Sequence, residues 1–345
     1  MKNNIFKIVF VILGTMIGAG FASGQEMYLF FFSYGLNGII GILISSLILG
    51  IVTYKTLQLL KKNKSEYKEI TTYRNFLDLL IKGNHRKIKE IISFTLNIFI
   101  LITFFIMIAG FGAYFEQQLG INSLIGSTAL AVLCLLIFMK SVKGVVKANE
   151  FIVPILIICL LIIGIINFKE INLLEIKDYI IRENNSNFIL SAILYSSYNS
   201  VFLIPVLITL RRYIINKKQI AMISIITTCI IILLSVIVYL ILLRVDVDIN
   251  KLEMPAVYVV SNMFYLLKYI YGFIILGSIF TTSISLGTSF LQNTVKNKKS
   301  YTQIASIMCI IAVLISKIGF SNLVSSLYPI FGYLGLIQII RIICI

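Results

Sequence analysis

The most informative stretch of this chain is Gly14-Thr-Met-Ile-Gly-Ala-Gly-Phe-Ala-Ser-Gly-Gln-Glu26. It lies inside an apolar run from about Ile5 to Phe32, which is long enough to cross a bilayer at roughly 20 residues per helical span. Four glycines fall within eleven positions, and each costs a helix interior about 1 kcal/mol relative to alanine. Unwound backbone at membrane depth is tolerated only where it faces protein or a water-filled cavity. We therefore expect a broken first helix, the alternative being close packing of a continuous helix through its glycines.

Most of the chain is apolar, with 59% hydrophobic residues among 345 and a mean hydropathy of +0.99. Apolar runs between charge clusters predict an all-α integral membrane protein with ten spans. The N-terminal run is too long for the apolar part of a cleavable signal peptide, and further spans follow it. The spans are expected at about 5–33, 36–60, 90–115, 121–139, 150–168, 187–210, 218–244, 267–294, 301–318 and 321–343.

Basic residues are unevenly distributed between the two sides of the predicted bundle. With the N-terminus placed in the cytoplasm, 23 of the 30 Lys and Arg residues fall on the cytoplasmic side and 7 on the outer side. Because such an excess marks the cytoplasmic side, we expect a multi-pass protein of the cell inner (cytoplasmic) membrane with both termini cytoplasmic. The net charge of +16 is then explained by anionic lipid headgroups, and no nucleic acid partner is predicted.

The sequence contains no arrangement typical of an enzyme. Its five cysteines all fall in predicted spans and form no Cys-x-x-Cys pair, and no nucleophile–base pair or metal motif converges there. A Gly-rich phosphate-binding loop ending in Lys-Ser/Thr is also absent, so no ATP motor is predicted. We expect a protein without enzymatic activity and without a cofactor, with sodium as a candidate bound ion. The oligomeric state is not predicted.

The predicted spans form two halves of five, about 5–168 and about 187–343, within a single transmembrane domain of residues 1–345. An odd number of spans per half gives the halves opposite orientations, which is the inverted repeat of many secondary transporters. Long segments at matching positions support this pairing, because 61–89 follows the second span and 245–266 follows the seventh.

The counterpart of the first span is the sixth, which carries the polar cluster Tyr195-Ser-Ser-Tyr-Asn-Ser200 and then Pro205. Ser and Asn side chains compete with the backbone for hydrogen bonds, and proline removes one intrahelical bond. We expect a second break here. The alternative is a continuous helix that buries a polar face inside the bundle.

A break in the first span would present free amides and the positive end of a helix dipole to a cavity, which suits a carboxylate. The helix that ends near Ile17 would leave unpaired carbonyls, which suit an ammonium group or a small cation. A zwitterionic amino acid is the simplest ligand that satisfies both ends. The predicted substrate contacts are Gly18, Ala19, Gly20, Ser197, Tyr198 and Asn199.

Two further features indicate ion coupling. In the eighth span, Ser278-Ile-Phe-Thr-Thr282 offers neutral oxygens of the kind that hard cations prefer, although such hydroxyls also bond to their own preceding turn or to a neighbouring helix. Glu26 lies one to two turns beyond the glycines, and an ionisable group in or near a membrane is costly and a functional candidate. It could carry a proton, contact an outer gate or hold a neighbouring donor.

Three motifs resemble a known family. They are the 14–26 stretch, Ala-Gly-Phe-Gly-Ala-Tyr-Phe-Glu at 109–116 and Leu-Tyr-Pro-Ile-Phe-Gly-Tyr-Leu-Gly-Leu at 327–336, and they look like the YkvI-type bacterial membrane proteins. The motifs fall in the first, third and tenth predicted spans, so the resemblance covers effectively the whole chain. That family is in turn similar to the amino acid–polyamine–organocation superfamily. The similarity implies a LeuT-type inverted repeat of ten helices, with helices 1 and 6 broken.

The superfamily resemblance also implies a sodium site. Its sodium-coupled members use two carbonyls of the first helix, then a carbonyl and a Thr/Ser pair of the eighth. The sequence departs from the superfamily pattern in two ways, since the sixth span lacks the glycine often found at its break and the third shows no obvious mid-span tyrosine for a substrate carboxylate. The positions that match the sodium site are Gly14, Ile17, Ser278, Thr281 and Thr282.

These features predict a cation-coupled secondary transporter of a small solute, an amino acid or a related compound, that works by alternating access. Proton coupling through Glu26 is the alternative to sodium coupling. A membrane sensor or assembly protein that uses the same fold without transport is the alternative from another functional class.

Overall fold

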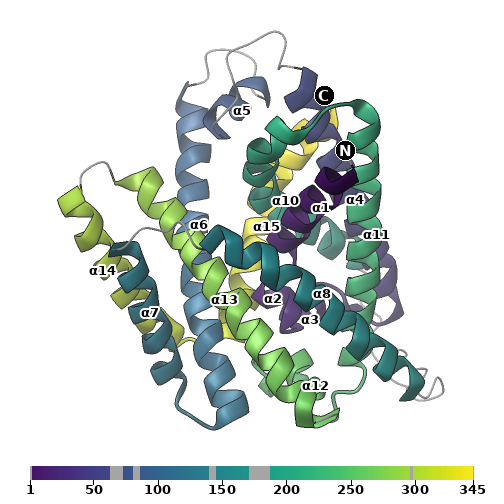
Figure 1. Ribbon diagram of the computed structural model, residues 1–345, viewed down its shortest axis with the longest axis vertical. Helices are drawn as coiled ribbons and strands as arrows, with labels where there is room; N and C mark the ends of the chain where they lie inside the picture. The colour runs from purple at the N-terminus through teal and green to yellow at the C-terminus, as the bar shows by residue number, and fades with distance from the viewer. Residues whose placement is uncertain are drawn as a thin grey trace.

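The apolar runs of the sequence form long helices that pack side by side (Figure 1). The structure is a computed structural model, and it describes residues 2–62, 73–80, 86–139, 145–170, 187–263, 265–295 and 298–344. Within these ranges every regular element is an α-helix or a short 3-10 helix, and none is a strand. The predicted all-α fold class is therefore confirmed for the described residues.

The helices follow the predicted spans closely. After the first span, which consists of several short elements, the long helices begin and end within a few residues of the expected limits. They are α4 (Leu36–Lys62), α6 (Arg86–Leu119), α7 (Ser123–Met139), α8 (Val145–Glu170), α10 (Phe188–Leu210), α11 (Lys217–Leu242), α13 (Tyr265–Thr294), α14 (Lys298–Ser316) and α15 (Phe320–Cys344). Short elements lie between them, namely α5 (Tyr73–Leu80), η2 (Arg211–Tyr213), η3 (Ile249–Lys251) and α12 (Pro255–Met263).

Six of these helices, α4, α6, α10, α11, α13 and α15, are long and apolar enough to cross a membrane by themselves. Shorter apolar helices, which belong to α1, α7, α8 and α14, occupy the other four predicted spans. The multi-pass character of the described chain is thus supported by length and composition. Ten crossings, and the repeat boundaries at 168 and 187, stay predictions.

The first predicted span is broken twice. Helix α1 (Lys2–Met16) is followed by the one-turn helix α2 (Ala19–Ala22), then by α3 (Gln25–Phe30) and the 3-10 turn η1 (Phe32–Tyr34). These short elements lie among the longer helices in the interior of the bundle (Figure 1), and the α2 residues are all buried. Their polar backbone is therefore enclosed by protein, as irregular backbone at membrane depth requires.

The predicted break in the sixth span is wrong, because α10 is a continuous helix from Phe188 to Leu210. Its polar side chains bond to their own preceding turns without opening the helix: the Ser196 hydroxyl donates to the Ile193 carbonyl and the Ser200 hydroxyl to the Ser197 carbonyl. No glycine lowers helix propensity here, and Pro205 lies inside the helix without ending it.

Helix α10 forms the centre of the bundle. Buried residues make up 72% of its most apolar window, the highest share among the six long apolar helices. It packs against α4, α15 and α1. The closest approach is to α15, where a Cβ added at Gly332 or Gly335 would overlap the α10 backbone at Leu194 and Ser197.

The outer surface of the bundle is apolar. Large side chains such as Phe273, 81% exposed, and Ile337, 66% exposed, lie on the surface of α13 and α15. A soluble protein rarely exposes contiguous apolar patches of such extent, whereas lipid tails solvate them without cost.

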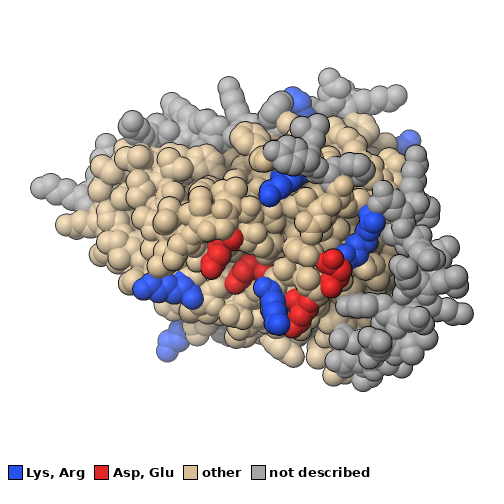
Figure 2. Space-filling view, turned by 90° about the horizontal axis from the view of Figure 1, so that it is seen from below, with Lys and Arg blue, Asp and Glu red and all other residues tan. Residues whose placement is uncertain are grey.

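Both chain ends lie at one end of the bundle (Figure 1). The opposite end carries α12 and the α6–α7 connection, and Figure 2 shows acidic and basic side chains interspersed on it. The long 245–266 segment predicted for this end contains η3 and α12. Most of its expected counterpart, 61–89, lies outside the described residues, apart from α5 and the helix ends beside it.

Candidate functional site

The break between α1 and α2 lies at Gly18, directly after Ile17, near which the first helix was expected to end. The Ile17 amide makes the last bond of α1, donating to the Leu13 carbonyl at 2.7 Å. Gly18 is then extended, with φ −87° and ψ −171°. Helix α2 begins anew at Ala19, and the Ala22 amide donates to the Gly18 carbonyl at 3.0 Å. Within the described residues, no backbone bond joins the amides of Ala19 or Gly20 back to α1.

A second break at Gly24 was not predicted. Gly24 adopts φ +86°, in the left-handed region that favours glycine. The space is restricted as well, because an added Cβ would lie 2.9 Å from the Cβ of Ala256 in α12. The Ala256 amide in turn donates to the Ser23 carbonyl at 2.9 Å. The chain thus turns twice within eight residues and enters α3 at Gln25.

Glu26 of α3 lies beside the first break, next to Gly20 of α2. Its side chain is 4% exposed, and its Oε2 accepts a hydrogen bond from the Tyr198 hydroxyl of α10. A Cβ added at Gly20 would overlap the Glu26 Oε1. The structure therefore brings together three residues that the sequence analysis had placed in two spans, and of the three roles considered for Glu26 it shows the contact with a neighbouring donor.

An aromatic cluster surrounds Tyr198, the hydrogen-bond partner of this carboxyl group. Phe30 stacks on Tyr198 with ring centroids 5.5 Å apart, and Tyr328 of α15 lies 4.8 Å from the Tyr198 ring. Tyr195 packs edge-on against Tyr198 at 5.4 Å. Among the described residues, no Lys or Arg pairs with Glu26, and no cluster of three His, Cys, Asp or Glu side chains is suited to a metal ion.

The other two α10 residues predicted as substrate contacts lie differently. The Asn199 amide donates to the Tyr195 carbonyl of its own helix at 3.1 Å. Ser197 lies where α10 meets Gly335 of α15, and its buried hydroxyl has no hydrogen-bond partner. Tyr198 is thus the only one of the three that the structure shows in contact with the break region.

The predicted sodium ligands are divided between α1 and α13. Ser278 and Thr281 are buried, Thr282 is partly buried, and the Thr281 hydroxyl donates to the Gly277 and Ser278 carbonyls at 3.0 and 3.1 Å. Gly14 and Ile17 lie at the end of α1, which packs against α8, α10 and α11, whereas α13 packs against α2. The sodium site stays a prediction.

Two tyrosines near the break were missed by the sequence analysis. The Tyr271 hydroxyl of α13 donates to the Ala22 carbonyl at 2.5 Å, which ties α13 to α2. Tyr328, already described, belongs to the 327–336 motif. Their position in apolar spans could have identified them from the sequence, because a buried tyrosine usually needs a hydrogen-bond partner for its hydroxyl.

The segment 249–263, comprising η3 and α12, covers the site at the end of the bundle away from the termini (Figure 1). The Gln25 side chain donates to the Leu252 carbonyl at 2.8 Å. The Gln117 amide of α6 makes two bonds to the Met254 backbone, at 2.9 and 2.8 Å. The Glu253 carboxylate accepts from the Ser321 amide at the start of α15, at 2.7 Å. This covering segment is therefore fixed by polar contacts to α3, α6 and α15.

Glu253 lies outside the membrane-spanning helices. Burial raises the pKa of its carboxyl group, against the lowering effect of the Ser321 and Phe320 amides, and the nearby Glu116 carboxylate adds to the rise. The charged form of Glu253 is therefore disfavoured where it caps α15.

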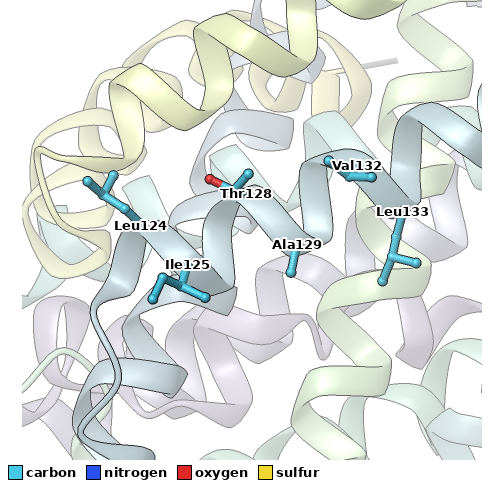
Figure 3. Close-up of a pocket in the computed structure, with 6 residues that line it drawn as sticks. All are labelled: Leu124, Ile125, Thr128, Ala129, Val132 and Leu133. Atoms are coloured by element: carbon cyan, nitrogen blue, oxygen red, sulfur yellow. The ribbon is translucent and has the colours of Figure 1, made fainter.

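Two surface depressions lie away from the break, on α7 and at the start of α6. One is a shallow depression along the exposed face of α7, and Figure 3 shows its side chains directed outward from the helix. It is almost wholly apolar, which suits contact with lipid, and it contains none of the break residues. Its lining residues are Leu124, Ile125, Thr128, Ala129, Val132 and Leu133.

Two known proteins are similar to this chain along nearly its whole length. No family model matches it. It is 30% identical to the "Uncharacterized membrane protein YkvI" of Bacillus subtilis (strain 168), over 99% of this chain and 96% of that one. It is 24% identical to "Uncharacterized protein YyaD" of the same organism, over 96% of this chain and 93% of that one.

Among solved structures, the fold is similar to that of a Na+-coupled sialic acid symporter, captured in a substrate-bound outward-open state. The TM-score is 0.53 at 16% identity, over 95% of this chain and 75% of the symporter. This likeness shows a shared fold. The identity to YkvI along nearly the full length of both proteins shows that the chain belongs to the YkvI family of membrane proteins.

Proposed function

We propose that the protein is a cation-coupled secondary transporter of a small solute, an amino acid or a related compound. The observation that carries this proposal is the break at Gly18, next to the buried helix α2, with the hydrogen-bonded pair of Glu26 and Tyr198 beside it. Broken helices at membrane depth are where transporters with inverted repeats bind their solutes.

Alternating access would occur around the broken first span. We propose that α10, which is continuous and central, acts as a fixed wall, while α1 and the α2–α3 pair change their tilt on either side of Gly18. The amides of Gly18, Ala19 and Gly20 would receive an anionic group of the solute. Tyr198 would orient this group. To contact the solute, Ser197 would first have to leave its contact with α15, and the Asn199 amide would have to release the Tyr195 carbonyl of α10.

Sodium is the first candidate for the coupling ion. It would bind between the end of α1 and α13 through Gly14, Ile17, Ser278, Thr281 and Thr282. The threonine hydroxyls keep lone pairs for a cation while they donate to the carbonyls of their own helix. A proton carried by Glu26 is the second candidate, and it is favoured by the burial of Glu26 with no basic partner among the described residues.

The positive-inside distribution of Lys and Arg supports an inner-membrane protein with cytoplasmic termini, and the structure puts both termini at one end. The covering segment 249–263 would then face the outside. We infer that it closes the outer entrance to the break.

The test is a thermal-unfolding screen of purified protein against amino acids and small solutes, in sodium or in potassium, followed by uptake into proteoliposomes. A ligand that binds only the folded state raises the unfolding temperature by mass action. We expect a stabilising solute that is also accumulated. Thr282→Ala should remove any sodium dependence, and Thr128→Ala on the exposed face of α7 is its matched control.

Three outcomes separate the candidates. Stabilisation by a solute that depends neither on sodium nor on Thr282 would exclude the sodium site and leave the proton as the candidate coupling ion. Stabilisation without uptake would exclude transport and favour a sensor. Folded protein that neither responds to any solute nor accumulates one would contradict the proposal.

A further inference from the structure

Glu26 is the one acidic or basic side chain among the buried residues of the described chain. Its position is fixed from two sides, by the Tyr198 hydroxyl at Oε2 and by the Gly20 backbone beside Oε1. Glycine at position 20 leaves the space that the carboxyl group fills. The carboxyl group therefore belongs to the break itself rather than to a distant gate.

The groups that face Glu26 are polar or aromatic but not charged. Helix α10 contributes Tyr195 and Tyr198, and α15 contributes Tyr328. Helix α2 contributes only small or apolar residues, and the titratable side chain that α13 brings to α2, Tyr271, bonds to the Ala22 carbonyl. Across the described residues, nothing next to Glu26 carries a positive charge that could balance a carboxylate.

This arrangement allows two electrically balanced states. With the site empty, a carboxylate enclosed by protein and lacking a cation is strongly disfavoured, so the neutral carboxylic acid is the stable form. When a cation enters, its charge stabilises the carboxylate and the proton leaves. Proton and cation therefore compete for one position.

The surroundings favour an organic ammonium group as that cation. The carboxyl group adjoins an aromatic cluster, because Phe30, Tyr195 and Tyr328 pack around Tyr198, whose hydroxyl donates to Glu26, and aromatic rings attract ammonium groups. Carbonyls at the end of α1 offer further acceptors. A divalent metal ion would demand several oxygen ligands with more negative charge, and the described residues hold no such cluster.

Building on the proposed transport function, we propose that Glu26 binds the ammonium group of the solute and exchanges its own proton for it. The neutral acid Glu26–COOH meets R–NH3+, the O–H bond breaks, and the carboxylate pairs with the ammonium group. The released proton passes to water, so one proton leaves for each ammonium group bound. The solutes are primary amines and amino acids with a free amino group, and the proton moves in the opposite direction to the solute.

The test uses matched sets of three probes: L-leucine, isoamylamine and 4-methylpentanoate, and L-phenylalanine, phenethylamine and 3-phenylpropanoate. Within each set, one compound has both charged groups, one only the ammonium and one only the carboxylate. Titration calorimetry on purified protein in two buffers with different heats of ionisation counts the protons released. We expect binding by ammonium-bearing probes, release of one proton, and an apparent affinity that rises by up to about tenfold per pH unit.

Variants assign the effect to one side chain. Glu26→Gln should abolish both the proton release and the preference for ammonium, whereas Glu116→Gln, at an exposed acid on the end of α6, should preserve both. Infrared spectra of the empty protein should contain a protonated carboxyl band that Glu26→Gln lacks and that a bound amine removes. Tyr198→Phe keeps the acid and should shift this band, which tests the assignment even if Glu26→Gln does not fold.

The proposal is overturned by binding of an acid that has no ammonium group, by amine binding without proton release, or by a Glu26→Gln protein that keeps both. A folded protein that binds no probe, or that lacks the carboxyl band, also overturns it. Uptake into proteoliposomes is measured separately. Proton-releasing binding without uptake would refute transport but preserve the Glu26 site. Uptake of only those probes that carry a carboxylate and no ammonium group would preserve transport but refute the Glu26 site.

Discussion

Three glycine substitutions test the geometry of the broken span most directly. Gly24 has φ +86° and no room for a Cβ, since Ala256 Cβ, the Ala256 amide nitrogen and Leu242 Cδ2 all lie within 2.9–3.0 Å of that position. Gly120 has φ +66° and nothing within 4 Å, and Gly18 has neither a positive φ nor a close neighbour. The three sites therefore separate backbone strain from steric overlap.

The expected losses of stability follow from these differences. Gly120→Ala incurs the left-handed strain alone, about 1–2 kcal/mol. Gly24→Ala incurs the same strain plus overpacking against α12 and α11, a further 1–3 kcal/mol or so. Gly18→Ala incurs neither and should change the free energy of unfolding little. The predicted order of destabilisation is Gly24 first, Gly120 second and Gly18 last.

Unfolding can be followed with a thiol-reactive fluorescent dye on purified protein in detergent. Cys134, Cys159 and Cys309 are buried and become reactive only on unfolding, while Cys229 and Cys344 are exposed and set the background. Equal losses for Gly24→Ala and Gly120→Ala would refute the contact between Gly24 and α12. A large loss for Gly18→Ala would refute the open, extended conformation at the first break.

Further predictions concern the site and its covering segment. Gly20→Ala should displace the Glu26 carboxyl group that occupies the space of the new Cβ, so stabilisation by solutes should be lost while the protein still folds. Gln117→Ala removes two hydrogen bonds to the Met254 backbone and should lower the unfolding free energy by about 1–3 kcal/mol. Burial raises the pKa of Glu253 above 4.5, so the folded state binds a proton that the unfolded state has released. The stability of the wild type relative to Glu253→Gln should therefore fall as pH rises above about 4.5, until the folded-state pKa is passed.

Each of these predictions has a matched comparison. Gly120→Ala, at a position with nothing within 4 Å and outside the proposed site, should keep the solute response that Gly20→Ala loses, and equal responses would contradict the contact with Glu26. Gln118→Ala removes a single side-chain bond to Ser261 and should be the milder neighbour of Gln117→Ala. For Glu253, a stability difference that rises with pH, measured by the loss of circular dichroism on unfolding from pH 4 to 8, would contradict the sign.

The positions of the spans could be read from the sequence because they depend on local properties. Long apolar runs form helices wherever lipid surrounds them, since only a helix or a closed barrel satisfies the backbone there. The break at Gly18 was predictable for the same reason, because a glycine-rich stretch weakens a helix whatever its neighbours are. The conformation of α10 was not, because the same polar residues suit a broken helix and a buried helix face equally well.

The sequence alone thus determined an all-helical membrane protein whose first span is broken at Gly18, together with the residue types available at that break. Only the tertiary structure decided which of them meet. Glu26 and Tyr198 are 172 residues apart in the chain and form a hydrogen bond because α3 packs against α10. The second break at Gly24 likewise depends on α12, whose Ala256 occupies the space beside it. Contacts between distant segments follow from how whole helices pack, and the pattern within one helix does not record its neighbours.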